Sequence, residues 1–355
     1  MPGSVWGQEF RITTFGESHG GGIGVVVEGI TPGLEIDPAM IQHELDRRRP
    51  GQSAVSTTRR EPDTAEILSG VFEGRATGTP LLLLIRNRDQ RPQAYDEVKN
   101  LFRPGHADFA YQQKYGLRDY RGGGRSSGRE TAARVAAGAI AKMLLARHHI
   151  AITAYVKRAA GISCENIDFS AIEKNAVRAA DLDAAAKMQA RIVALKSAGN
   201  SAGGIVECVI RGVPAGLGEP VFDKLDADLA KAMLSLGAVK GIEFGEGFAA
   251  VDLTGRENND EIDVSGFLSN HAGGITGGIS TGQEIVFRLA VKPTASISQP
   301  QRTIDGDGRA VECRTIGRHD PFIGARLVPV VEAMSAIVLV DHLKRQEALR
   351  ENTVN

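Results

Sequence analysis

The segment 126–149, SSGRETAARVAAGAIAKMLLARHH, places the strongest limit on what this chain can fold into. Ser127 and Glu130 have the spacing of a capping box, in which two side chains satisfy the first backbone N–H groups of a helix. The rest of the segment is almost entirely alanine, glycine and aliphatic residues. A helix that is apolar on every side is buried, and small side chains allow close packing. We therefore predict a buried helix over 126–149 with neighbours packed closely around it.

The remaining segments alternate between helical and β-prone patterns. Asp37 and Pro38 have the residue types of an N-cap and a first helical position, which predicts a helix over 37–49 that ends before Pro50. Further helices are predicted over about 170–197, 221–234 and 328–349, and strands over 9–15, 23–30, 66–72, 80–86, 150–156, 204–212, 239–244 and 284–291. We expect residues 87–125 to be long irregular segments, which are usually functional in a compact domain. No clean linker divides the chain, and the regular alternation of a doubly wound parallel sheet is missing.

Composition argues against several classes of protein. The 355 residues are 42% hydrophobic but include no apolar run near 18 residues, so we expect a soluble chain without a membrane span. The first ten residues lack the pattern of a signal peptide. Cys164, Cys208 and Cys313 are widely spaced, which suits a reducing cytoplasm, and no cysteine or histidine pair has metal-ligand spacing, so no metal is predicted. A net charge of −1 argues against a general nucleic-acid binder.

The segment 16–20, GESHG, fits the G-x-S-x-G pattern of a serine hydrolase, with Ser18 as the nucleophile. That motif needs a helix directly after the serine, but residues 20–27 hold four glycines and three valines, which do not start a helix. Two alternatives remain beside the hydrolase. The segment is either a plain glycine loop between strands, or a loop in which His19 is the reactive group and the glycines admit a ligand.

Several arginine-containing segments have the features of anion sites. In residues 121–130, three glycines and two serines lead into a helix N-terminus among three arginines, and both backbone N–H and guanidinium groups bind phosphate. Arg103, His106 and Asp108 share one Pro-Gly turn and could bind an anion and move a proton. Similar segments are Arg47–Arg49, Lys292–Ser296 and Arg318–Asp320. Each alone is equally explained by helix capping or surface ion pairs, but together they indicate a multiply anionic substrate.

Taken in series, these segments resemble the signature blocks of the chorismate synthase family. In chain order the blocks are Gly16–Gly20, Arg48–Gly51, Phe102–Asp108, Arg121–Gly138, His271–Gly274, Lys292–Ser296 and Gly317–Pro321. Such a series is far more specific than any one block, and it extends over nearly the whole chain, from about residue 7 to 345. The sequence is similar to the bacterial form, without the insertions of some eukaryotic relatives.

The resemblance implies a fold and a reaction. The fold would be a single α+β domain over residues 1–349, a β–α–β sandwich with antiparallel sheets packed around long central helices, followed by a frayed tail at 350–355. The reaction would be a 1,4-anti elimination that converts 5-enolpyruvylshikimate 3-phosphate into chorismate and phosphate, the last common step of the shikimate pathway to aromatic amino acids. Such lyases need reduced FMN although no net redox change occurs. A cytoplasmic homotetramer without nucleic-acid or membrane partners is expected, and self-reduction of FMN by NAD(P)H stays open.

The resemblance also assigns roles to residues. His19 would protonate the leaving phosphate, His106 would donate to the negative charge of the reduced flavin, and Asp320 would relay a proton near flavin N5. Substrate contacts would come from Ser18, Arg48, Arg103, Arg129 and Arg318. Flavin contacts would come from Arg125, Ser126, Ser127, Gly237, Ala238, Gly277, Lys292, Pro293, Thr294, Ala295, Ser296 and, again, Arg318.

Two positions depart from the family pattern. Ala54 stands where many relatives carry a second arginine six residues after the one matching Arg48, so Arg59 or Arg60 would replace that cation, or the anion would have one contact fewer. Gly237 stands where relatives often have asparagine, which removes a side-chain contact to the flavin. The rival interpretations are an α/β serine hydrolase and a flavin- or phosphate-binding protein without catalysis.

Overall fold

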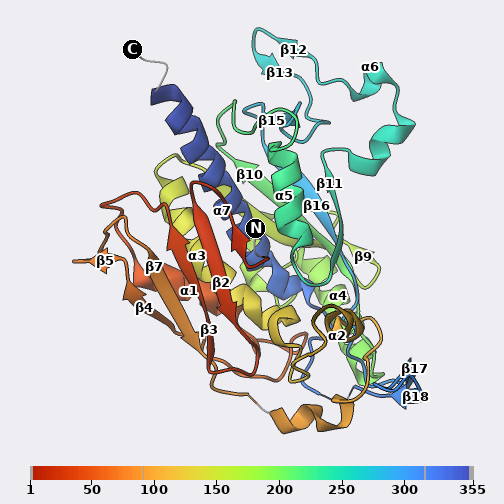
Figure 1. The fold of residues 1–355 in the computed structure, drawn as a ribbon. Helices are drawn as coiled ribbons and strands as arrows, with labels where there is room; N and C mark the ends of the chain where they lie inside the picture. The colour runs from red at the N-terminus through yellow and green to blue at the C-terminus, as the bar shows by residue number, and fades with distance from the viewer. Residues whose placement is uncertain (1–2, 91, 316, 352–355) are drawn as a thin grey trace.

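The computed structural model describes residues 3–90, 92–315 and 317–351 of the chain. Its outer layers are two antiparallel five-stranded sheets on opposite sides of long helices (Figure 1). In the first sheet the strands lie in the order β1 (Val5–Trp6), β2 (Arg11–Gly16), β3 (Gly22–Glu28), β7 (Leu81–Arg86) and β4 (Ala65–Ser69). In the second the order is β11 (Val239–Phe244), β16 (Ile285–Val291), β10 (Gly204–Arg211), β8 (Ala151–Ala159) and β9 (Ile162–Ser163).

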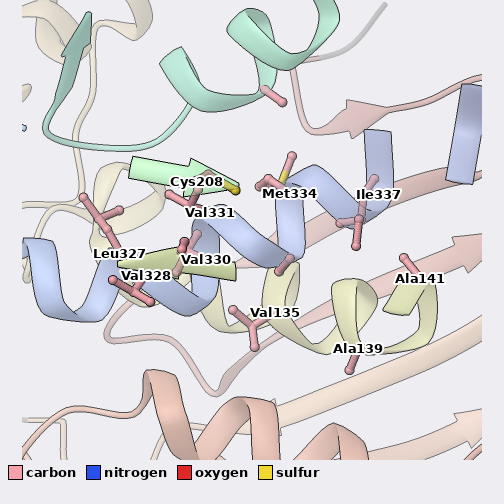
Figure 2. Close-up of a cluster of buried hydrophobic side chains, with 14 of the residues drawn as sticks. Val135, Ala139, Ala141, Cys208, Leu327, Val328, Val330, Val331, Met334 and Ile337 are labelled. Atoms are coloured by element: carbon pink, nitrogen blue, oxygen red, sulfur yellow. The ribbon is translucent and has the colours of Figure 1, made fainter. Parts of the chain in front are cut away.

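The helices α3 (Thr131–Ala146) and α7 (Gly324–Glu351) lie between the two sheets. α3 packs on β2, β3 and β7 of the first sheet, α7 packs on β8 and β10 of the second, and the two helices pack on each other. Figure 2 shows apolar side chains of α7 together with Val135 of α3 and Cys208 of β10 in this interior. The predicted α+β sandwich, with antiparallel sheets around long central helices, is therefore confirmed.

Shorter elements close the sides of the sandwich. α1 (Pro38–Arg48) packs against α3 and α7, and the side chain of Asp37 caps it by accepting from Ala39 N, as the sequence predicts. α5 (Leu225–Leu234) packs against α7 and β11. The other helices and hairpins are α2 (Asp108–Tyr115), α4 (Leu182–Ser197), α6 (Gly255–Asn258), β5–β6 (Val71–Phe72, Arg75–Ala76), β12–β13 (Ile262–Asp263, Gly266–Phe267), β14–β15 (Ile275–Thr276, Ile279–Ser280) and β17–β18 (Gln301–Ile304, Ala310–Cys313). Nowhere in the described residues is a helix both long and apolar enough to cross a membrane.

The predicted capping box at the start of the central helix is wrong. Ser127 caps only a short 3-10 turn over residues 128–130 by accepting from Arg129 N, and the α-helix begins at Thr131. The carboxylate of Glu130 does not turn back to the backbone, because it accepts from Thr14 Oγ1 and from Arg134. Competing tertiary partners therefore remove the local cap and delay the helix by several residues.

Other boundaries also differ from the prediction. Residues 87–125 are not irregular throughout, because they contain α2 and a 3-10 turn over 92–98. α4 begins only at Leu182, where the side chain of Asp181 accepts from Ala184 N and so starts the helix later than residue 170. Likewise α5 begins at Leu225 rather than 221, and α7 extends over Gly324–Glu351 rather than 328–349. Of the expected frayed tail, 350–351 belong to α7 and 352–355 lie outside the described residues.

A buried network of charges joins the layers beside the apolar core. Glu332 of α7 pairs with Arg47 of α1 at 2.6 Å and with Lys142 of α3 at 2.7 Å, and it accepts from Ala154 N of β8. Burial alone would raise the pKa of Glu332, but the two cations outweigh it and lower that pKa to about 2. The network fixes the C-terminal end of α1, where Arg48 is the last helical residue.

The closest approach of α3 and α7 is centred on Gly138. A Cβ added there would lie 2.3 Å from the Cβ and 2.6 Å from the Cα of Ala333, so only glycine fits between the two backbones. The small residues that make the central helix apolar on every side thus have a specific purpose. They let two helices share one narrow layer between the sheets.

Substituting Gly138→Ala is expected to destabilise the protein by about 1–3 kcal/mol, because overpacking forces α3 and α7 apart and outweighs the higher helix propensity of alanine. The measurement is urea unfolding followed by circular dichroism. Gly255→Ala is the control, since Gly255 is also helical and has open space where a Cβ would be added. Equal stability of the Gly138→Ala variant and the unmodified chain would contradict the packing argument.

Candidate active site

A cavity of about 1100 Å³ lies where loops from both sheets meet the N-terminal ends of α3 and α7 and the C-terminal end of α1. Of the residues predicted to bind substrate or flavin, the lining includes Ser18, His19, Arg48, Arg103, His106, Arg125, Ser126, Ser127, Arg129, Gly237, Ala238, Lys292, Pro293, Thr294, Ala295, Ser296, Arg318 and Asp320. Gly277 is the exception, because it lies in the β14–β15 turn and does not line this cavity. Segments that are far apart in sequence therefore converge on one space.

His19 lies in the loop between β2 and β3 and is buried, with its ring edge-on to Tyr95 at 5.1 Å between centroids. Its Nδ1 atom is buried without a hydrogen-bond partner. Burial and then the positive charge of Arg59 lower the pKa of His19 to about 4. His19 is therefore neutral at neutral pH in the ligand-free site, and an anion beside it would raise this pKa.

Ser18 does not have the surroundings of a nucleophile. Its Oγ accepts from Arg59 Nη1 at 3.1 Å, and its carbonyl accepts from Arg59 Nη2 at 3.1 Å. A strand, β3, follows the loop where a nucleophile elbow needs a helix. Among the described residues, neither an imidazole nor a carboxylate is hydrogen-bonded to this hydroxyl, so the activating base of a hydrolase is missing.

The glycine loop of residues 121–124 lies directly against two imidazoles. A Cβ on Gly122 would lie 2.5 Å from His19 Nδ1, and a Cβ on Gly123 would lie 2.9 Å from His106 Cε1. Both glycines have left-handed backbone conformations, with φ of +67° and +89°. Glycine is required here for backbone conformation and for space. One loop therefore contacts both histidines that the sequence predicts to be catalytic.

His106 belongs to a buried cluster at the start of α2. Its Nδ1 lies 2.8 Å from Asp108 Oδ1, and Arg103 donates to the same carboxylate through Nε at 2.7 Å and Nη2 at 2.8 Å. Burial would raise the pKa of Asp108, but hydrogen bonds from Arg103 and His106 lower it far below its ordinary value. Since an ionised carboxylate only accepts, Nδ1 of His106 carries the proton, and Nε2 is the nitrogen left for a ligand.

Two further guanidinium groups, from Arg48 and Arg129, lie deep in the wall of the cavity, with 0% and 4% of their surface exposed. Both pair with Asp63, which is completely buried. Burial lowers the pKa of Arg48 to about 9, although the negative charge of Asp63 raises that pKa. Arg48 Nε and Arg129 Nη2 are buried donors without hydrogen-bond partners. Unpaired cationic donors of this kind are what an anionic ligand satisfies.

Asp320 lies in the loop before α7 with both oxygens engaged. Its Oδ1 accepts from Thr57 N at 2.9 Å and its Oδ2 accepts from Arg326 Nη1. Nearby, Arg318 pairs with Asp89.

His319 also lines the cavity, and burial, followed by the charge of Arg103, lowers its pKa to about 4. This third imidazole was not among the predicted site residues.

The segment after β16 forms another wall. Lys292 Nζ donates to Gly105 O at 2.6 Å, and Thr294 Oγ1 is buried without a partner. Ala238, next to this segment, has a φ of +74°. A non-glycine residue adopts this conformation only when the surrounding structure imposes it. Lys292 N donates to Ala238 O at 2.9 Å, so the strained residue is held by the strand end itself.

The guanidinium group of Arg125 already has hydrogen-bond partners within the protein, because it donates to Thr14 Oγ1 at 2.7 Å and to Gly16 O at 3.1 Å.

Several residues of the site were not found by sequence reasoning. Tyr95, His319 and Arg326 line the cavity, and Glu61 and Asp63 hold its arginines. The segment 57–63, TTRREPD, carried a usable signal for these carboxylates. Its two acidic residues follow two arginines, and a carboxylate that becomes buried has to be paired with a cation.

Comparisons with known proteins agree with this geometry. The family model described as chorismate synthase matches residues 10–344 of the chain. A solved crystal structure of a chorismate synthase is similar to this chain, with 31% sequence identity, a TM-score of 0.75, and coverage of 96% of this chain and 93% of the other. The chain therefore belongs to the chorismate synthase family.

Proposed function

We propose that this protein is a lyase that eliminates phosphate from 5-enolpyruvylshikimate 3-phosphate to give chorismate, with reduced FMN as cofactor. The observation that carries the proposal is the convergence of His19, His106 and several desolvated guanidinium groups in one cavity. An allylic phosphate that leaves with its electron pair needs positive charge around it and a proton donor beside it. Membership of the chorismate synthase family supports this choice of substrate.

The residues present fit a flavin. A cavity of about 1100 Å³ is large enough for an isoalloxazine ring together with a second ligand, and Thr294 Oγ1 is an unpaired polar atom in its wall. Ser126, Ala238 and the segment Lys292–Ser296 would hold the cofactor, while Gly277 lies too far from this cavity to be included. When bound, reduced FMN supplies electron density that helps the C–O bond to phosphate break.

The substrate's anionic groups would be bound by Arg48 and Arg129 through their unpaired donors. His19 would give its proton to the leaving phosphate, after the charge of that phosphate has raised the low pKa of the ligand-free imidazole. Arg59, which contacts Ser18 and lines the cavity, would replace the cation missing at Ala54, whereas Arg60 does not line the cavity.

His106 would lie beside a negatively charged ring and donate a hydrogen bond to it from Nε2 as an imidazolium, since Asp108 fixes the orientation of its ring through Nδ1. Asp320 would accept a proton. Arg326 holds that carboxylate in place.

We also propose a homotetramer in the cytoplasm. Large apolar side chains are exposed on the arm between β11 and β16, which projects from the body of the molecule in Figure 1. They include Phe248, Val251, Ile262, Val264 and Leu268. Exposed apolar groups in such number favour a protein contact. Sedimentation analysis measures the assembly, and a monomer at micromolar concentration would contradict it.

The function is tested anaerobically with the protein, FMN, dithionite and 5-enolpyruvylshikimate 3-phosphate. We expect phosphate release only when the flavin is reduced, and a loss of about 10²–10⁴-fold in kcat for His106→Ala and for His19→Ala. Full activity of His106→Ala would exclude His106 from the reaction, whereas flavin binding without phosphate release by the unmodified protein would indicate a binding protein. Labelling of Ser18 by a fluorophosphonate would favour the hydrolase instead.

The contact of the glycine loop with His19 gives a second prediction. Gly122→Ala is expected to lower kcat by at least about tenfold, because its Cβ displaces the imidazole from the leaving phosphate. Gly116→Ala is the matched control, since Gly116 has the same φ of +67° but open space around it. Comparable activity of the two variants, measured as anaerobic phosphate release, would show that only backbone strain matters.

Substrate binding is expected to take up a proton. His19 is neutral at pH 7 because its pKa is about 4, and a bound phosphate raises that pKa, so the imidazole gains a proton and affinity falls as the pH rises. Calorimetric titrations in two buffers of different ionisation enthalpy measure the uptake. The His19→Asn variant should lose this component. Identical proton uptake by both proteins would assign it to another group.

A further inference from the structure

Asp63 joins two elements of the site from a position with no access to solvent. One carboxylate oxygen, Oδ2, accepts from Arg48 Nη2 at 3.0 Å, and the other, Oδ1, accepts from Arg129 Nη1. Arg48 ends α1 and Arg129 lies in the turn before α3, so this single side chain spans both elements. Burial would raise the pKa of Asp63, but the charges of both arginines lower it, and Asp63 stays ionised.

The backbone at Asp63 is held in a costly conformation. Its φ is +50°, in the left-handed region that favours glycine and that aspartate and asparagine tolerate better than other residues. A buried ion pair adds little net stability compared with apolar residues of the same volume. Neither the strain nor the charge is therefore explained by stability alone. Strained residues of this kind concentrate at functional sites.

The hydrogen bonds of the two arginines show what Asp63 leaves available. Arg48 directs Nη1 to Gly128 O and Thr131 Oγ1, and Arg129 directs Nε to Asn87 Oδ1 at 2.9 Å. With Asp63 on one further nitrogen of each, a single nitrogen on each guanidinium group has no hydrogen-bond partner, and that of Arg129 lies 3.9 Å from Glu61 Oε2. These are Arg48 Nε and Arg129 Nη2, and both arginines line the cavity.

We propose that Asp63 is a positioning residue for substrate binding, which fixes the separation and orientation of Arg48 and Arg129 so that their remaining donors bind the anionic groups of one ligand. The inference rests on the proposed function, in which these arginines contact the substrate. The two like charges repel each other without the carboxylate between them. Asp63 therefore acts through the arginines and does not touch the substrate.

The test is the variant Asp63→Asn, which keeps the side-chain shape and tolerates the positive φ but removes the charge. Binding of 5-enolpyruvylshikimate 3-phosphate to the flavin-free protein is measured by calorimetry, and KM and kcat by anaerobic phosphate release. We expect Kd and KM to rise at least about tenfold while kcat changes less than about threefold. Asp63→Gly, which relieves the strain and removes both acceptors, should raise Kd further.

Asp341→Asn is the matched control. Asp341 is also a buried carboxylate, and it accepts from the backbone N–H groups of Gln8, Glu9 and Phe10, but it does not line the cavity. This variant should lose thermal stability without a change in Kd. In an Arg129→Ala background, Asp63→Asn should raise Kd by a smaller factor than it does alone, because one of the two arginines it positions is gone.

The outcomes separate this inference from the proposed function. If the unmodified protein releases phosphate but Asp63→Asn binds the substrate with unchanged Kd, Asp63 is only structural and the inference is overturned. Equal effects of Asp63→Asn and Asp341→Asn on Kd would overturn it as well. If the unmodified protein neither binds the substrate nor releases phosphate, the proposed function itself fails.

Discussion

The contact between α3 and α7 at Gly138 and Ala333 is the constraint on which the rest of the structure depends. Because the two backbones nearly touch, both helices fit between the sheets, and their N-terminal ends reach the same side of the molecule. Arg129 precedes one helix and Asp320 precedes the other. The charged network around Glu332 then fixes α1 against both helices and brings Arg48 to the same place. Apolar packing thus decides where the polar chemistry lies.

Within the cavity, burial acts on cations and imidazoles in the same direction. It lowers the pKa of Arg48, His19 and His319, so the two imidazoles are neutral at neutral pH while Arg48 keeps its charge. The charge of Asp63 opposes this effect at Arg48, and the arginines beside Asp63 and Asp108 help to keep both carboxylates ionised. The multiply anionic ligand of the proposed function would therefore enter a site whose guanidinium groups are already oriented and whose His19 is neutral.

Much of the fold follows from the sequence, and the exceptions have physical reasons. The four longer strands of each sheet and α1 are recognisable because β-prone runs and the Asp37-Pro38 start are local signals, whereas the two-residue strands β1 and β9 are not. α2 is not, since it buries only Asp108 and its N-cap, Ala107, makes no side-chain capping bond. The residues predicted from the order of the motifs line one cavity, with the exception of Gly277, but Tyr95, His319 and Arg326 of the same cavity were not predicted. The carboxylates that hold the arginines were missed, because the pairing of Asp63 with Arg129 spans 66 positions and has no local pattern.

The loop of Gly122 and Gly123 has a consequence for how such a protein can change over time. Since one short run of backbone presses on His19 and on His106, any shift of that run moves both rings together. In the proposed function, proton delivery by His19 and charge stabilisation by His106 would therefore be mechanically linked. A change of substrate would also have to keep Arg48 and Arg129 together, since Asp63 holds both.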